Sequence, residues 1–163
     1  TFIAALIPAH TFLSNSAPYF LWPKGDEYDQ AYLLGILSSV PLDWYARRWI
    51  ELNVNIYFVK ALPIPVISRQ DPRRRRVAQI AAYITSQDRR LQDWGISVDN
   101  RLDSRFRGRE TADLLAELDA LVASLYGLNA DDLVQMFATF GGRISQDAER
   151  CAGAIDQFRT IEA

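Results

Sequence analysis

The sequence predicts an α+β fold, in which a small mixed β-sheet with two helices is followed by a helical C-terminal tail. Two observations lead to this prediction. Short apolar runs of the kind found in strands are confined to the first 62 residues. From residue 71 onward, apolar residues recur every three or four positions, as they do on one face of a helix. We therefore expect two parts: residues 1–68, which hold the sheet, and residues 69–163, which form a helical subdomain.

The first part begins with two short apolar runs, residues 2–7 and 19–22, which indicate two buried strands. A helix is expected next, because Asp26 can cap its N-terminus and apolar residues follow at helical spacing as far as Ser38. Pro41 fits the first turn of a second helix, which continues to about residue 50.

A third strand is predicted over residues 53–62, where successive side chains alternate with a period of two. Pro63 and Pro65 follow it. Proline has no amide hydrogen to donate to a neighbouring strand, so these two residues are expected to end the strand.

The second part is expected to be helical. Asp71-Pro72 is a typical helix start, and leucines at spacings of four and three mark a clear amphipathic helix further on. Residues 95–109 are polar and lack an apolar period, so we expect a partly disordered loop there. Gly141-Gly142 is expected to be a hinge before the last helix. The predicted helices span residues 72–95, 114–125, 129–140 and 147–158.

Composition excludes several classes of protein. One cysteine, Cys151, rules out an internal disulfide and is compatible with a reducing cytoplasm. With one histidine, His10, the chain lacks the ligands of a common zinc site. No apolar run reaches the roughly 18 residues of a membrane span. The first residues are apolar and include no Met, so we expect the chain to be a piece of a longer protein.

The motifs of common enzyme classes are missing. The chain has no glycine-rich phosphate or dinucleotide loop, since its only glycine pair lies between two predicted helices. Nucleases of the acidic-x-Lys type need a carboxylate two positions before a lysine, and neither Lys24 nor Lys60 has one. We therefore assign no catalytic residue and no metal ligand, and an autonomous enzyme is disfavoured.

Charge is distributed unevenly along the chain. Residues 41–109 hold fourteen Lys or Arg against seven Asp or Glu, whereas residues 110–163 hold three against ten. Arginine outnumbers lysine sixteen to two. A GC-rich genome would explain the preference for arginine codons. Codon preference explains less well why positive and negative charges are segregated along the chain. Arginine also has a function in recognition, because its guanidinium can bind phosphate or a guanine edge with two hydrogen bonds.

The candidate DNA-binding residues are the basic and amide side chains of this positive region. Arginine can contact phosphate or guanine, and asparagine can read an adenine edge. The candidates are Arg47, Arg48, Asn53, Asn55, Lys60, Arg73, Arg74, Arg75 and Arg76. The alternative interpretation of the four consecutive arginines is a solvated helix face that pairs with the acidic helices at residues 110–132.

A succession of blocks resembles the C-terminal region of type IIG-like restriction–modification enzymes, which fuse an endonuclease to an adenine-specific DNA methyltransferase. In chain order the blocks read APYFLWPKGDEYDQAYLLGILSSVPLDWYARR, NVNIYFVKALPIP, RRRRVAQIAAYI and ELDALVASLYGLNADDLVQMFATF. The resemblance covers roughly residues 1–140. The resemblance rests on the order of the four blocks along the chain, because each block alone matches the family only weakly.

The resemblance implies a target-recognition region that binds double-stranded DNA and is itself non-catalytic, in a bacterial and cytoplasmic protein. The cofactor loop, methyltransferase motif and nuclease motif of the family would lie before residue 1. S-adenosylmethionine and Mg²⁺ are accordingly expected for the parent protein and not for this fragment, and some related chains serve phage defence. A different class of function remains open: the chain would be a structural module whose acidic helices, residues 110–140, dock onto the upstream methyltransferase domain or onto a partner subunit.

Overall fold

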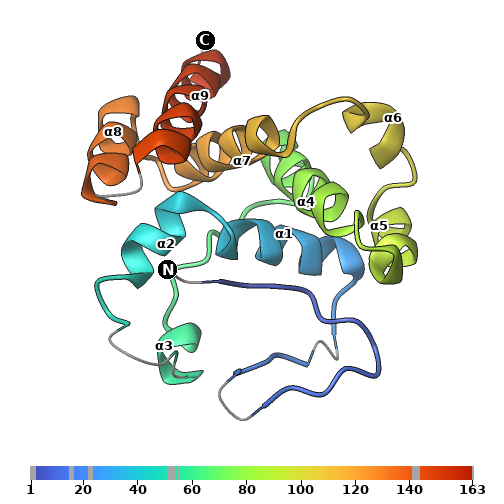
Figure 1. Cartoon of the computed structure of the whole chain (residues 1–163). Coiled ribbons are helices and arrows are strands. Elements are labelled where there is room, and N and C mark those ends of the chain that lie inside the picture. The colour runs from blue at the N-terminus through green and yellow to red at the C-terminus, as the bar shows by residue number, and fades with distance from the viewer. Residues whose placement is uncertain are drawn as a thin grey trace.

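The computed structural model describes residues 3–14, 17–21, 24–50, 54, 56–140 and 144–162, and every regular element in this part of the chain is a helix (Figure 1). The helices are α1 (Glu27–Leu37), α2 (Val40–Ala46), α3 (Ile56–Lys60), α4 (Pro72–Thr85), the short 3-10 turn η1 (Arg89–Leu91), α5 (Gln92–Val98), α6 (Leu102–Phe106), α7 (Thr111–Leu125), α8 (Ala130–Thr139) and α9 (Ile144–Glu162).

The predicted α+β class is therefore wrong, because the described residues contain no strand and no sheet. Residues 3–14 and 17–21 run as irregular chain, drawn in blue below α1 in Figure 1. Ile56–Lys60, expected within the third strand, is helical, and the Ala61 amide bonds to the Phe58 carbonyl oxygen at 2.9 Å. A strand needs a neighbouring strand to complete its hydrogen bonds. None is paired with this segment in the described part of the chain, so local i to i−3 bonds form instead.

Several helix starts lie where capping chemistry predicts them. The Asp26 carboxylate accepts a hydrogen bond from the Asp29 amide at 3.0 Å, and Asp71 does the same for Arg73 at 2.8 Å. Asn129 forms a capping box with Asp132, in which each side chain accepts from the other residue's amide. The predicted starts of α1, α4 and α8 are confirmed.

The predicted single helix over residues 72–95 and the predicted loop over residues 95–109 are both wrong. The helix ends at Thr85, and the chain then folds back through η1 into α5 and α6. Gly95 makes this return possible, because a β-carbon there would lie only 2.6 Å from the Ser86 β-carbon. α5 can therefore approach the end of α4 closely.

The main core lies where α4 crosses α1 and α7, near the centre of Figure 1. Gly35 of α1 faces Val77 of α4 so closely that a β-carbon would come within 2.6 Å of Val77 Cγ1. Leu42 and Leu62 are buried in the same cluster as Val77 and Leu121. The core thus draws on both sides of residue 68, while the expected division into residues 1–68 and 69–163 stays a prediction.

A second, smaller core joins α7, α8 and α9 around the fully buried Leu133 and Phe158. Gly141-Gly142, predicted as a hinge before α9, lies outside the described residues. Among the helices that the structure describes, none is long and apolar enough to cross a membrane.

Candidate nucleic-acid interface

The first two predicted arginines stack on aromatic rings at the end of α2. The Arg47 guanidinium lies 3.9 Å from the ring centroid of Phe140 and forms an ion pair of 3.0 Å with Asp43. The Arg48 guanidinium lies 3.9 Å from the Trp44 ring. Such cation–π contacts orient a guanidinium on a surface without consuming its hydrogen-bond donors. Both arginines therefore have an aromatic partner, and both are exposed.

The remaining candidates of this segment give less information. Lys60 is exposed in the last turn of α3 and makes no ion pair with any described residue. Asn53 and Asn55 lie outside the described residues. Their predicted contacts with adenine edges stay predictions.

Arg73 and Arg74 are occupied within the protein. Arg73 binds the Asp71 carboxylate at 2.8 Å and the Ser124 hydroxyl oxygen at 3.1 Å. Arg74 is only 14% exposed, pairs with Asp29 at 2.7 Å and donates to the Ile67 carbonyl oxygen. Rearranging Arg74 toward a ligand would break these contacts. It is a structural arginine in this fold.

Arg76 is also occupied, and its partner lies on the acidic helix α7. Its Nε lies 2.5 Å from one oxygen of Glu117, and Arg109 lies 2.5 Å from the other. Burial alone would raise the pKa of Glu117, but the hydrogen bonds from these two arginines outweigh it and lower the pKa. Pairing with the acidic helices, the alternative interpretation of the arginine run, thus applies to Arg76.

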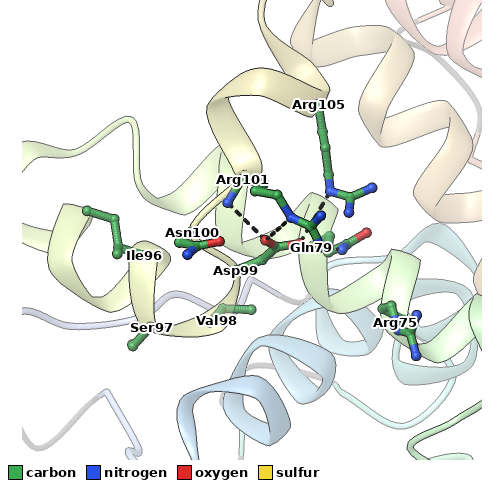
Figure 2. A pocket seen from close by; sticks show the side chains of 9 residues that line it. All are labelled: Arg75, Gln79, Ile96, Ser97, Val98, Asp99, Asn100, Arg101 and Arg105. Atoms are coloured by element: carbon green, nitrogen blue, oxygen red, sulfur yellow. Dashed lines mark hydrogen bonds and ion pairs between the residues drawn. The ribbon is translucent and has the colours of Figure 1, made fainter.

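Arg75 differs from its three neighbours. Its side chain is exposed, has no acidic partner among the described residues, and lines an open cleft of about 450 Å³ (Figure 2). The cleft lies between α4, α5 and α6. It is lined by Arg75, Gln79, Ile96, Ser97, Val98, Asp99, Asn100, Arg101 and Arg105.

Asp99 is the only acidic side chain lining this cleft, and two arginines gather around it. Arg105 Nε lies 3.4 Å from Asp99 Oδ2, and Arg101 Nε lies 3.9 Å from Oδ1. The carboxylate also accepts hydrogen bonds from the Gln79 side chain at 2.6 Å and from the Arg101 amide at 2.9 Å (Figure 2). With three arginines against one carboxylate, the cleft carries a net charge of about +2 at neutral pH.

Sequence reasoning missed Arg101 and Arg105, because residues 95–109 were expected to be a loop. A helical signal is nevertheless present there. Leu102 and Phe106 are four residues apart and both buried, and the two arginines precede them with the same spacing. Arg75 therefore lines the same cleft as two arginines outside the predicted set, while Arg47 and Arg48 contact rings elsewhere, directly after α8 and in α2.

The described residues contain no group of three or more His, Cys, Asp or Glu side chains that could hold a metal ion. Asp99, the one carboxylate of the cleft, is already surrounded by cationic and amide donors. The cleft fits an anion and does not fit Mg²⁺, whose preferred ligands are several carboxylate or carbonyl oxygens.

No protein-family model, curated protein or solved structure matches the chain. The resemblance to restriction–modification enzymes rests on the sequence blocks alone.

Proposed function

We propose that this chain is the DNA-binding target-recognition region of a cytoplasmic type II restriction–modification protein. The order of the sequence blocks supports the family, and the arginine-lined cleft supports nucleic-acid binding. In this proposal the fragment binds double-stranded DNA. The upstream part of the parent protein carries the endonuclease and adenine N6-methyltransferase activities with S-adenosylmethionine and Mg²⁺.

The cleft is the observation that carries the proposal. Arginines at a protein surface contribute little to folding and lose side-chain entropy when ordered. Arg75 of α4, Arg105 of α6 and Arg101 directly before α6 line one open surface that holds a single carboxylate, Asp99. A polyanion such as duplex DNA, with one charge per about 1.7 Å of its axis, is the partner that this surplus of positive charge favours.

The proposal is tested by titrating a fluorescently labelled 20-base-pair duplex with the 163-residue chain and measuring anisotropy at several salt concentrations. We expect binding at 50 mM salt that weakens steeply by 200 mM, because bound phosphates release counterions. A matched titration with a neutral polymer of the same length, such as a peptide nucleic acid duplex, should show no binding. A chain that is folded by circular dichroism and does not bind the DNA duplex at 50 mM salt would refute the proposal.

A second function, docking onto the upstream methyltransferase domain, is favoured by a different observation. Large apolar side chains that are more than three-fifths exposed gather before α1, after α2 and before α4. They include Ile3, Phe12, Tyr19, Leu21, Trp49 and Val66. Where exposed apolar side chains lie together, they are typical of interaction surfaces. The resemblance places the methyltransferase domain directly before residue 1, which is next to the first of these segments.

This surface differs from the acidic helices that the sequence suggested for docking. On α7, Glu117 and Asp119 are buried and paired with arginines of the same chain. Hydrogen exchange distinguishes the two surfaces. If residues 3–21 dock upstream, their amides should exchange more slowly in the parent protein than in the fragment, whereas the exchange of α8 should not change. Equal exchange of residues 3–21 in both would exclude this docking.

A further inference from the structure

We infer that the cleft between α4, α5 and α6 binds phosphate groups of the duplex backbone, with Arg75, Arg101 and Arg105 as the binding residues. The inference rests on the proposed function and adds to it a defined site. Two of its three arginines lie outside the residues that the sequence indicated.

The geometry prepares two of these arginines for an anion. Asp99 is anchored by the buried Gln79 side chain and by the Arg101 amide, so its position does not depend on the arginine side chains. Arg101 and Arg105 both approach it through Nε. The terminal amino groups of both guanidiniums accordingly make no hydrogen bond to any described residue, and they remain available for phosphate oxygens.

Charge neutralisation elsewhere sets the cleft apart. Three nearby arginines are each paired with a carboxylate of the same chain: Arg107 with Asp103, Arg90 with Asp88, and Arg109 with Glu117. In the cleft, Arg101 and Arg105 share one carboxylate, and Arg75 has no acidic partner among the described residues. The cleft therefore has a surplus of about two positive charges. A phosphate can bind there without first displacing a carboxylate from its arginine.

The remaining polar lining suits the backbone of DNA better than its bases. Asn100 offers a side-chain amide, a common partner of phosphate oxygens, whereas the Ser97 hydroxyl already donates to the Trp94 carbonyl oxygen at 2.7 Å. The cleft is wide and open, so it does not impose the planar geometry needed to recognise a base edge. Phosphate contacts position a protein on DNA without reading its sequence. The contribution of the cleft should be equal for duplexes of different sequence.

The test replaces Arg75, Arg101 and Arg105 one at a time with glutamine in the 163-residue chain. The matched control is Arg107→Gln, which removes the same charge at the end of α6 from a side chain that is 81% exposed and does not line the cleft. Binding of two duplexes of unrelated sequence is followed by anisotropy between 50 and 200 mM salt. Unfolding curves confirm that each variant is as stable as the wild type.

Each cleft variant should lose one phosphate contact. The slope of log K against log salt should then become shallower by about 0.9, which corresponds to roughly eightfold weaker binding at 0.1 M salt if affinities converge at 1 M. Both duplexes should be affected equally, and Arg107→Gln should change binding less than twofold.

The outcomes separate this inference from the proposed function. If the wild type binds duplexes and the cleft variants bind like Arg107→Gln, the cleft inference is wrong and DNA binding stands. A loss confined to one duplex would indicate base recognition and would also overturn it. If the wild type binds no duplex, DNA binding fails, and inorganic pyrophosphate is titrated instead. Perturbed Nε resonances of Arg101 and Arg105 would then support a phosphate site for another source, whereas unchanged resonances would overturn the site itself.

Discussion

Replacing Arg150 with methionine should destabilise the fold strongly, because this arginine neutralises a buried charge. Its Nε and one terminal nitrogen lie 2.6 and 2.9 Å from the two oxygens of Asp119, which is fully buried. The same carboxylate accepts a hydrogen bond from the Val40 amide at 2.8 Å. Asp119 therefore ties together α2, α7 and α9. Methionine has a comparable length and removes the charge and the donors.

The magnitude follows from the burial of the carboxylate. Removing one partner of a buried ion pair costs about 3–5 kcal/mol, because the other charge is left unpaired. The Arg150 side chain is 26% exposed, so water can reach the space it leaves, and we expect the lower end of this range. About 3 kcal/mol is a large part of a typical stability of about 5–15 kcal/mol. For a chain of this size it lowers the Tm by roughly 6–12 °C.

The loss should depend on pH with a defined sign. Burial raises the pKa of Asp119, and the charge and hydrogen bonds of Arg150, together with the Val40 amide, offset part of the rise. A carboxyl group with a raised folded-state pKa favours folding while protonated, and this contribution is lost as the pH rises through that pKa. Without Arg150 the pKa rises further. The cost of Arg150→Met should therefore be largest at neutral pH and shrink as the pH falls toward about 4.

Urea unfolding followed by circular dichroism measures these free energies. The matched control is Arg159→Met on the same helix. The Arg159 side chain is 70% exposed, and its terminal nitrogen lies as far as 3.9 Å from a carboxylate oxygen of the exposed Asp156, so this ion pair is worth at most about 1 kcal/mol. Combining Asp119→Asn with Arg150→Met should recover stability relative to Arg150→Met alone, since asparagine is neutral and can still accept from the Val40 amide. The reasoning is refuted if Arg150→Met costs no more than Arg159→Met, or if its cost is the same at pH 4.5 and pH 7.

Two further predictions concern α7 and the contact between α1 and α4. The pKa of Glu117 is lowered despite burial, because Arg76 and Arg109 bind its carboxylate. The stability that Glu117 contributes is therefore present above about pH 4.3, and it is lost as the pH falls through the folded-state pKa. Glu117→Gln should flatten the acid side of a plot of unfolding free energy against pH, and an unchanged profile would contradict this. Gly35→Ala should cost about 1–3 kcal/mol in urea unfolding, because its β-carbon would lie 2.6 Å from Val77 Cγ1. In a Val77→Ala background, Gly35→Ala should cost less free energy of unfolding than it does in the wild type. A raised Tm for Gly35→Ala would disprove the clash.

Local chemistry explains which elements could be predicted. Asp26, Asp71 and Asn129 cap helices through hydrogen bonds to residues two or three positions away, so a short stretch of sequence contains all of the interaction. The leucine stripe of α7 is equally local. By contrast, the predicted strands depended on partners elsewhere in the chain. Apolar alternation shows that a segment can pair but does not supply a neighbouring strand.

The same distinction applies to the candidate site. The sequence showed that residues 41–109 are rich in arginine, and four of them are consecutive. It did not show which of those charges are neutralised, because the partners lie far away in the chain. Arg74 pairs with a residue 45 positions earlier, and Arg76 with one 41 positions later.

By itself, then, the sequence determined the starts of α1, α4 and α8, the leucine stripe of α7 and the concentration of positive charge before residue 110. Only the tertiary structure decided that the first part has no sheet in its described residues, and that Arg75 joins Arg101 and Arg105 while its neighbours are paired. The physical reason is that capping and periodicity act between residues close in sequence, whereas strand pairing and charge neutralisation depend on contacts between residues far apart in it.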